Sequence, residues 1–170
     1  MRTIIVTGSV GAGKTALSKK LALAARYIYV DVNKIIKKYN LAEGYDRKRK
    51  SKIIDADKLS KALISVIKSL EEDESAKGVI IDSHLSHHLP AKYAGLCIIV
   101  KCSINLLNKR LKNRGYSKSK IRENLDAEIF NVCLEEAKEK GHRIMVVDTS
   151  KGINKNAVSS VVKWVRKRKK

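Results

Sequence analysis

The residues best suited to chemistry stand close together near the start of the chain. The segment GSVGAGKT, residues 8–15, matches the pattern G-x-x-x-x-G-K-[ST] in full. Glycines leave backbone N–H groups bare, so a phosphate can approach them closely, and the start of a following helix favours the same anion. Lys14 is expected to reach the β- and γ-phosphates, and the Thr15 hydroxyl to bind Mg²⁺. The motif predicts a nucleoside triphosphate site; a tight strand-to-helix turn with a chance lysine is the alternative.

A second group of chemically capable residues follows the apolar run GVIID, residues 78–82. P-loop proteins take a second Mg²⁺ contact from an aspartate, and Asp82 has a suitable place at a strand end, although a plain turn residue is the alternative. His84 is a candidate for orienting a water or a phosphate oxygen, or for acting as a base. His87 and His88 raise the question of zinc. No cysteine or carboxylate has matching spacing, so we interpret them as ordinary loop histidines.

Further cations are placed where phosphoryl transfer needs them. The segment NKRLKNRGYSKSK, residues 108–120, carries Arg110, Arg114 and several lysines at a helix–glycine–helix break. This pattern is typical of a short lid that brings positive charge to the phosphates and excludes water, with a solvated basic face as the alternative. A second phosphate-bearing substrate would need its own site. The basic segment 37–52 lies where kinases of small phosphorylated molecules place that site.

The elements that must position these residues alternate along the chain. Apolar, β-branched runs predict strands at residues 3–7, 27–30, 78–82, 96–102 and 143–149. Apolar residues three and four apart predict helices at residues 14–27, 32–40, 55–72, 104–114, 117–140 and 153–167. Asp55 or Asp57 is expected to cap one helix and Ser117 another, whereas residues 41–54 lack periodicity and predict an exposed loop. The alternation predicts a single α/β domain with a five-stranded parallel sheet flanked by helices, and ligands at the carboxyl ends of its strands.

The charge balance favours polyanionic partners. The 170 residues include 37 Lys and Arg against 17 Asp and Glu, which gives a net charge of +20. Phosphates, RNA or an anionic surface are the corresponding partners, and a lysine-rich surface that serves solubility or heat tolerance is the alternative. The cations are densest in residues 37–52 and 163–170.

The cysteines and the apolar runs bear on the compartment. Cys97, Cys102 and Cys133 show no metal-ligand spacing and are interpreted as small buried residues of a protein in a reducing compartment. The apolar run at the N-terminus is too short for a signal peptide, and no stretch approaches the roughly 20 apolar residues of a membrane span. We therefore expect a cytoplasmic protein that does not bind membranes.

Taken together, these motifs resemble a known family. The chain is similar to the adenylate kinase-like family of archaea and eukaryotes that assists small ribosomal subunit maturation, which includes the adenylate kinase isoenzyme of nuclei and Cajal bodies. The resemblance covers nearly the full length. It depends on TGSVGAGKT (7–15), EGYD (43–46) followed by IIDADKL (53–59), GVIIDSH (78–84), RLKNRGYSKSKIRENLDAEIF (110–130) and the tryptophan-containing VVKWVRKRKK (161–170).

This resemblance implies a P-loop NTPase fold with ATP and Mg²⁺ as cofactors, an NMP-binding region at 31–54, a short lid at 113–123 and a basic tail at 166–170. The ATP-binding residues would be Gly11, Ala12, Gly13, Lys14, Thr15, Ala16 and Arg114. The catalytic residues would be Lys14, Asp82, His84 and Arg114, and Mg²⁺ would be bound by Thr15 and Asp82. The monophosphate would be contacted by Asp31, Lys37 and Tyr45. Lys37 stands where the family tends to place an arginine, and a lysine cannot grip a phosphate with two parallel bonds.

The implied activity is that of an adenylate kinase, ATP + AMP giving two ADP, with ATPase activity and a role in small ribosomal subunit maturation. The alternative is an ATPase assembly factor or switch that binds a ribosomal protein of the small-subunit platform, and rRNA, with little kinase role. In either case we expect a monomer or weak dimer. A nucleic-acid-binding module without catalysis is disfavoured, because one Phe and one Trp offer few platforms for stacking bases.

Overall fold

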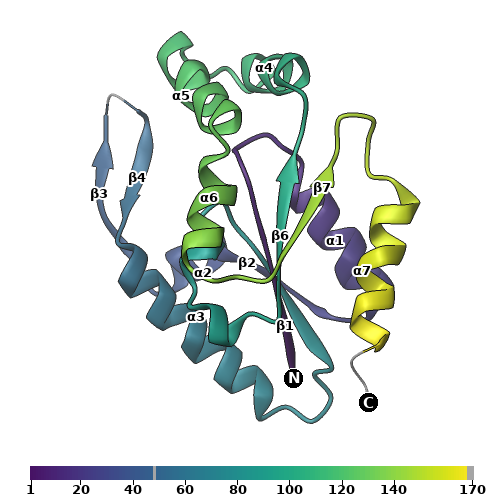
Figure 1. Cartoon of the computed structure of the whole chain (residues 1–170). Helices are drawn as coiled ribbons and strands as arrows, with labels where there is room; N and C mark the ends of the chain where they lie inside the picture. The colour runs from purple at the N-terminus through teal and green to yellow at the C-terminus, as the bar shows by residue number, and fades with distance from the viewer. Residues whose placement is uncertain (48, 168–170) are drawn as a thin grey trace.

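A five-stranded parallel sheet forms the centre of the molecule. The computed structural model describes residues 1–47 and 49–167, so most of the basic tail predicted at 166–170 lies outside the described residues. The strand order is β2-β5-β1-β6-β7, and each neighbouring pair is parallel (Figure 1). The strands are β1 (Arg2–Thr7), β2 (Ile28–Asp31), β5 (Gly78–Asp82), β6 (Leu96–Lys101) and β7 (Ile144–Asp148). The predicted five-stranded parallel sheet is confirmed.

The central strands are apolar throughout because both faces of the sheet are covered. Along β1, Ile4 and Val6 belong to one buried cluster, whereas Ile5 between them belongs to the other. Each of these three side chains is 0% exposed. Successive side chains of a strand point to opposite faces, so a strand packed on both sides has no polar alternation to show.

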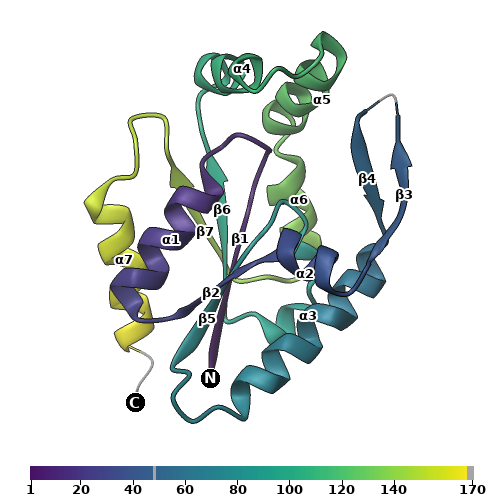
Figure 2. The ribbon, with the colours of Figure 1, turned by 180° about the vertical axis from the view of Figure 1, so that it is seen from behind.

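Helices form a layer on each face of the sheet. Helices α1 (Lys14–Ala25) and α7 (Lys155–Lys167) lie on one face, and α3 (Ala56–Glu71) and α6 (Val132–Glu139) lie on the other (Figures 1 and 2). Leu17 and Leu21 of α1 pack into the first cluster, and Leu59 and Leu63 of α3 into the second. Two further helices follow the carboxyl ends of strands, α2 (Val32–Lys38) after β2 and α4 (Ile104–Asn113) after β6, and α5 (Lys118–Ile129) follows α4. Two 3₁₀ turns, Ser86–His88 and Ala91–Tyr93, join β5 to β6.

Two of the predicted helix caps are present. The Asp55 carboxylate accepts hydrogen bonds from the backbone N–H groups of Asp57, at 2.8 Å, and Lys58, at 3.0 Å, so Asp55 and not Asp57 begins α3. The Ser117 hydroxyl accepts a bond from the N–H of Lys120 at 3.3 Å and begins α5. Both side chains satisfy backbone donors that have no partner inside the helix.

The single helix predicted over residues 117–140 is wrong. Helix α5 ends at Ile129, and α6 begins at Val132. Asn131 between them has a φ of 55°, in the left-handed region that breaks a right-handed helix. Asparagine adopts this conformation more readily than most residues, which makes it a natural break point.

The loop predicted at residues 41–54 is also wrong, although the segment is exposed as expected. It forms an antiparallel hairpin of β3 (Ala42–Asp46) and β4 (Ser51–Ile54) that stands apart from the main sheet (Figure 1). The hairpin reaches helix α5: Arg49 Nε is 2.8 Å from Glu123 Oε1, and Lys120 Nζ donates to the carbonyl of Lys50 at 3.1 Å. A hairpin with few buried side chains shows no polar–apolar alternation in its sequence.

Two of the three cysteines are buried, as predicted from the sequence. Cys97 and Cys102 are buried, Cys133 is half-buried, and the three thiols are free. Burial raises the pKa of Cys97 to about 12. Within residues 1–47 and 49–167, no helix has the length and apolar character that crossing a membrane requires.

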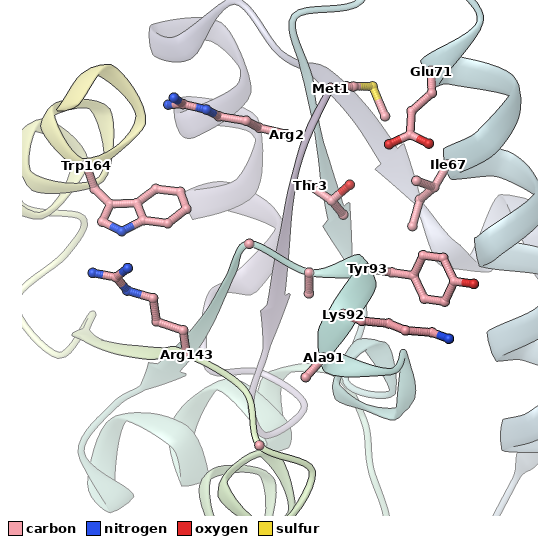
Figure 3. Close-up of a pocket in the computed structure, with 13 residues that line it drawn as sticks. Met1, Arg2, Thr3, Ile67, Glu71, Ala91, Lys92, Tyr93, Arg143 and Trp164 are labelled. Carbon is pink, nitrogen blue, oxygen red and sulfur yellow. The ribbon is translucent and has the colours of Figure 1, made fainter. Parts of the chain in front are cut away.

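A cavity of about 490 Å³ opens at the end of the sheet where β1 begins (Figure 3). Trp164 of α7, Arg143 before β7 and Tyr93 are among its lining residues. The guanidinium carbon of Arg143 lies 5.5 Å from the centre of the Trp164 ring, within reach of a cation–π interaction. Because β1 leads from this end towards the glycine-rich segment, the cavity and residues 8–15 lie at opposite ends of the strands.

Candidate functional site

The glycine-rich segment forms a tight loop between β1 and α1. Gly8, Gly11 and Gly13 have φ values of 136°, 93° and 102°, which residues other than glycine rarely adopt. A Cβ atom on Gly11 would lie 3.0 Å from a methyl carbon of Leu107, and one on Gly13 would lie 3.3 Å from the hydroxyl of Thr149. The backbone therefore follows the path of an anion-binding loop that leads into the start of a helix.

Lys14 folds back over this loop. Its ammonium group donates to the carbonyls of Gly8, at 2.8 Å, and Ser9, at 2.9 Å. Burial lowers the pKa of Lys14 to about 8, and the largest opposing effect comes from Cys133. At pH 7 the side chain is still mainly protonated. A desolvated cation among bare backbone groups fits a bound polyphosphate.

A cavity of about 540 Å³ lies over the loop, at the carboxyl ends of β1 and β5. It brings together most of the site residues predicted from the sequence: Gly11, Gly13, Lys14, Thr15, Ala16, Asp82, His84 and Arg114. Four further residues line it: Val10, Lys19, Asn33 and Ser83. The cavity combines cations, a carboxylate and hydroxyl groups, as a site for a metal-bound phosphate requires.

Asp82 is held in place by a neighbouring tyrosine. It is the last residue of β5, it is 5% exposed, and Tyr29 Oη donates to its Oδ2 at 2.9 Å. Burial raises the pKa of Tyr29, and the bond to Asp82 adds to the effect. The Thr15 side chain is within hydrogen-bonding reach of the same phenol. A carboxylate and a hydroxyl that share one neighbour form a suitable set of hard oxygen donors for Mg²⁺.

His84 presents a neutral imidazole to the cavity. Burial lowers the pKa of His84 to about 4, and the positive charge of Lys14 acts in the same direction. His84 is also an exposed residue, so solvent moderates this shift, but the ring is uncharged at pH 7 in either case. An uncharged imidazole can accept a hydrogen bond from a water or a hydroxyl group.

The remaining predicted residues lie outside the cavity lining. The Asp31 carboxylate accepts from the N–H of Asn33 at 2.9 Å and caps helix α2. Lys37 is exposed in the last turn of α2, and Tyr45 is 59% exposed on the hairpin. Ala12 is fully buried, and its carbonyl accepts a hydrogen bond from Thr149 Oγ1 at 2.6 Å.

Three side chains hold the loop from distant elements, and two of them, Thr149 and Glu128, were not singled out from the sequence. Thr149 follows β7, and Arg110 of α4 donates to the carbonyl of Gly11 at 3.1 Å. Glu128 of α5 is 5% exposed, and its Oε2 accepts from the Ser9 hydroxyl at 2.6 Å. Glu128 Oε1 accepts from the N–H of Cys102 at 3.2 Å. The three bonds to the loop join residues about a hundred or more positions apart, so no local pattern reveals them; the only signal is that Glu128 lies in the segment DAEIF.

A double-mutant cycle measures the link between helix α5 and the glycine loop. We expect the losses in unfolding free energy caused by Ser9→Ala and Glu128→Ala to be non-additive by about 2 kcal/mol, because a buried hydroxyl–carboxylate bond joins the two residues. Urea unfolding of both single variants and of the double variant gives the coupling. The control pairs Ser9→Ala with Glu123→Ala, an exposed glutamate of the same helix. Equal coupling in both cycles would contradict the link.

The AAA domain family matches residues 4–131. A protein of Methanocaldococcus jannaschii named "Putative adenylate kinase" is 36% identical over 166 residues, covering 98% of this chain and 87% of that protein. The "Adenylate kinase isoenzyme 6 homolog" of Caenorhabditis elegans is 35% identical over 136 residues, covering 80% and 72%.

The solved structure of deoxyadenosine kinase from M. mycoides with bound dATP is also similar, with a TM-score of 0.54. It is 17% identical in sequence, and the match covers 98% of this chain and 100% of that one, so it bears on the fold alone. The match of the family model over most of the chain and relatives at 35% and 36% identity, together with the P-loop kinase fold, lead to one assignment. The chain belongs to the adenylate kinase-like family of P-loop phosphotransferases.

Proposed function

We propose that this protein is a Mg²⁺-dependent adenylate kinase that converts ATP and AMP into two ADP. The observation that carries the proposal is the cavity in which Lys14, on its glycine loop, meets Asp82 and Arg114. The names of the archaeal and eukaryotic relatives support the same substrates. ATP would lie with its phosphates on the backbone of residues 11–16.

The reaction requires positioning and charge neutralisation more than covalent chemistry by the protein. A phosphate oxygen of AMP attacks the γ-phosphorus of ATP, and the bond from that phosphorus to the β-phosphate oxygen breaks. Lys14 and Arg114 neutralise charge on the phosphates in the transition state. Asp82 and Thr15 would bind Mg²⁺, which supplies further positive charge at the phosphates when bound. His84 would orient the attacking oxygen.

A second candidate is an ATPase that acts in small ribosomal subunit maturation, where it would bind a ribosomal protein of the small-subunit platform and rRNA. Two observations favour it. Asp31, Lys37 and Tyr45, the expected contacts for the monophosphate, are absent from the cavity lining, which consists only of described residues. The net charge of +20 favours a polyanionic partner. With water as the attacking group, His84 would orient that water.

One assay separates the two reactions. With ATP, Mg²⁺ and AMP, we expect two ADP for each AMP consumed and no release of inorganic phosphate, because a kinase transfers the γ-phosphate to AMP. Nucleotides are measured by ion-exchange chromatography and phosphate by a coupled colour reaction. Parallel reactions contain CMP, or no monophosphate. Each is repeated with small ribosomal subunits at several salt concentrations.

The outcomes differ in kind. Inorganic phosphate in equal amount to ADP, with AMP unchanged, contradicts the kinase and supports the ATPase. Stimulation by ribosomal subunits that weakens as salt rises supports the ribosomal role, since contacts with nucleic acid phosphates are salt-dependent. Turnover unaffected by subunits at every salt concentration contradicts that role.

A further inference from the structure

Two histidines beside the β5 loop meet a glutamate that the sequence places far away. His87 and His88 lie in the turn Ser86–His88, and Glu136 lies in helix α6. The ligand atoms of the three side chains all lie within 4.8 Å of one another. The His87 side chain is 2% exposed, whereas the Glu136 side chain is 41% exposed, so the cluster is buried at His87 and accessible to solvent at Glu136. Glu136 supplies the carboxylate that local spacing did not reveal.

The hydrogen bonds around His87 leave one ring nitrogen facing a negative charge. Thr7 Oγ1 lies 3.2 Å from the carbonyl of His84 and 2.8 Å from His87 Nδ1; when its proton is donated to that carbonyl, the ring N–H at Nδ1 donates to the hydroxyl. His87 Nε2 then lies 2.5 Å from Glu136 Oε2. With the ring proton on Nδ1, both atoms present electron pairs. A positively charged group must lie between them, either a proton or a metal ion.

We propose that His87, His88 and Glu136 bind one divalent transition-metal ion, with Zn²⁺ as the best fit. Two imidazoles and one carboxylate form a ligand set that zinc uses, and a fourth position remains for water. Tetrahedral ligand atoms about 2.1 Å from zinc are about 3.4 Å apart. The three ligand atoms lie within 4.8 Å of one another, and the 2.5 Å between His87 Nε2 and Glu136 Oε2 is shorter than this separation, so a bound ion would require the open Glu136 side chain to move away from His87.

The surroundings of the cluster fit a metal site in a further respect. Ligand histidines are usually oriented by a hydrogen bond from their other nitrogen, and Thr7 provides that bond for His87. The positive charge of Lys140 near His88 opposes a bound cation and limits its affinity.

The site differs from the proposed Mg²⁺ site in both place and chemistry. Asp82 and Thr15 offer only oxygen, which Mg²⁺ prefers, whereas the imidazoles select a softer ion. A bound zinc ion would link the turn Ser86–His88, which follows β5, to helix α6.

The test is a titration of the full chain with Co²⁺ as a spectroscopic substitute for Zn²⁺, with Mg²⁺ in excess to occupy the oxygen site. We expect visible ligand-field absorption that saturates at one Co²⁺ per chain and disappears when one equivalent of Zn²⁺ is added. His88→Ala and Glu136→Gln should each weaken binding by at least about 100-fold, because each removes or neutralises a direct ligand. Glu135→Gln, a neighbour on the same helix, is the matched control and should leave binding unchanged.

Circular dichroism checks that each variant is folded. Because Glu136 is partly exposed, its variant keeps the test valid if His88→Ala fails to fold. Absence of stoichiometric binding, or equal affinity in the wild type and the Glu136→Gln variant, overturns the proposal. A strong near-ultraviolet band from thiolate to Co²⁺ also overturns it, since that band assigns the ion to the cysteines.

Discussion

Replacement of Lys14 by alanine is expected to reduce ATP-dependent phosphoryl transfer by about 1000-fold or more while the protein remains folded. Lys14 is the cation that the glycine loop places in the cavity with Asp82, and nothing else on the loop can take over its charge. Burial lowers the pKa of Lys14 to about 8, so folding disfavours its charged form at pH 7. Removal of the side chain should therefore not lower the free energy of unfolding.

Steady-state rates of ADP formation and urea unfolding curves are the two measurements. Lys20→Ala is the control, because Lys20 is an exposed residue of the same helix and does not line the cavity. Its activity should equal that of the wild type. A Lys14→Ala enzyme with unchanged turnover would remove the glycine loop from the mechanism, and with it the proposed kinase and ATPase functions alike.

The second large effect is expected from Gly8→Ala. A Cβ atom at this position would lie 2.3 Å from the carbonyl oxygen of Val100, and the φ of 136° is itself unsuited to a side chain. The contact is with backbone of the neighbouring strand β6, which cannot swing aside as a flexible side chain would. We expect a loss of more than about 3 kcal/mol in the free energy of unfolding, or failure to fold.

Gly115→Ala separates crowding from backbone conformation. Gly115 also has a positive φ, of 69°, but a Cβ there meets no atom within 4 Å. This variant should cost only about 1 kcal/mol, the usual penalty for a side chain in the left-handed region. Both costs are read from urea unfolding. Similar losses for the two variants would show that the close approach of Gly8 to β6 contributes nothing.

The sequence predicts the main sheet well because its strands are covered on both faces. Runs such as GVIID have no other stable use in a protein of this size, and the predicted strand at residues 78–82 coincides with β5. The hairpin at residues 42–54 escapes the same reasoning. Its side chains are mostly exposed, so its order comes from pairing of the backbone, which a pattern of apolar residues does not record.

The residues around the candidate site also fall into two groups, those that a local motif reveals and those that only the packing of distant elements brings together. The residues of the glycine loop belong to one local motif, and Gly11, Gly13 and Lys14 line the same cavity. Glu128 and Thr149 act through hydrogen bonds to the loop that form only after distant elements have packed, and the zinc proposal depends on Glu136 in the same way. The spacing of residues along the chain does not predict such long-range contacts.

The chain contains a single tryptophan, Trp164, and the fold places it at the cavity where β1 begins. Its fluorescence emission is therefore a natural reporter of that edge alone, free of overlapping signals from other indoles. If nucleotide binds at the glycine loop, a change in the emission of Trp164 would report a structural change at the opposite end of the sheet. Trp164 can therefore serve as an intrinsic fluorescent probe of structural coupling between the glycine loop and the opposite end of the sheet.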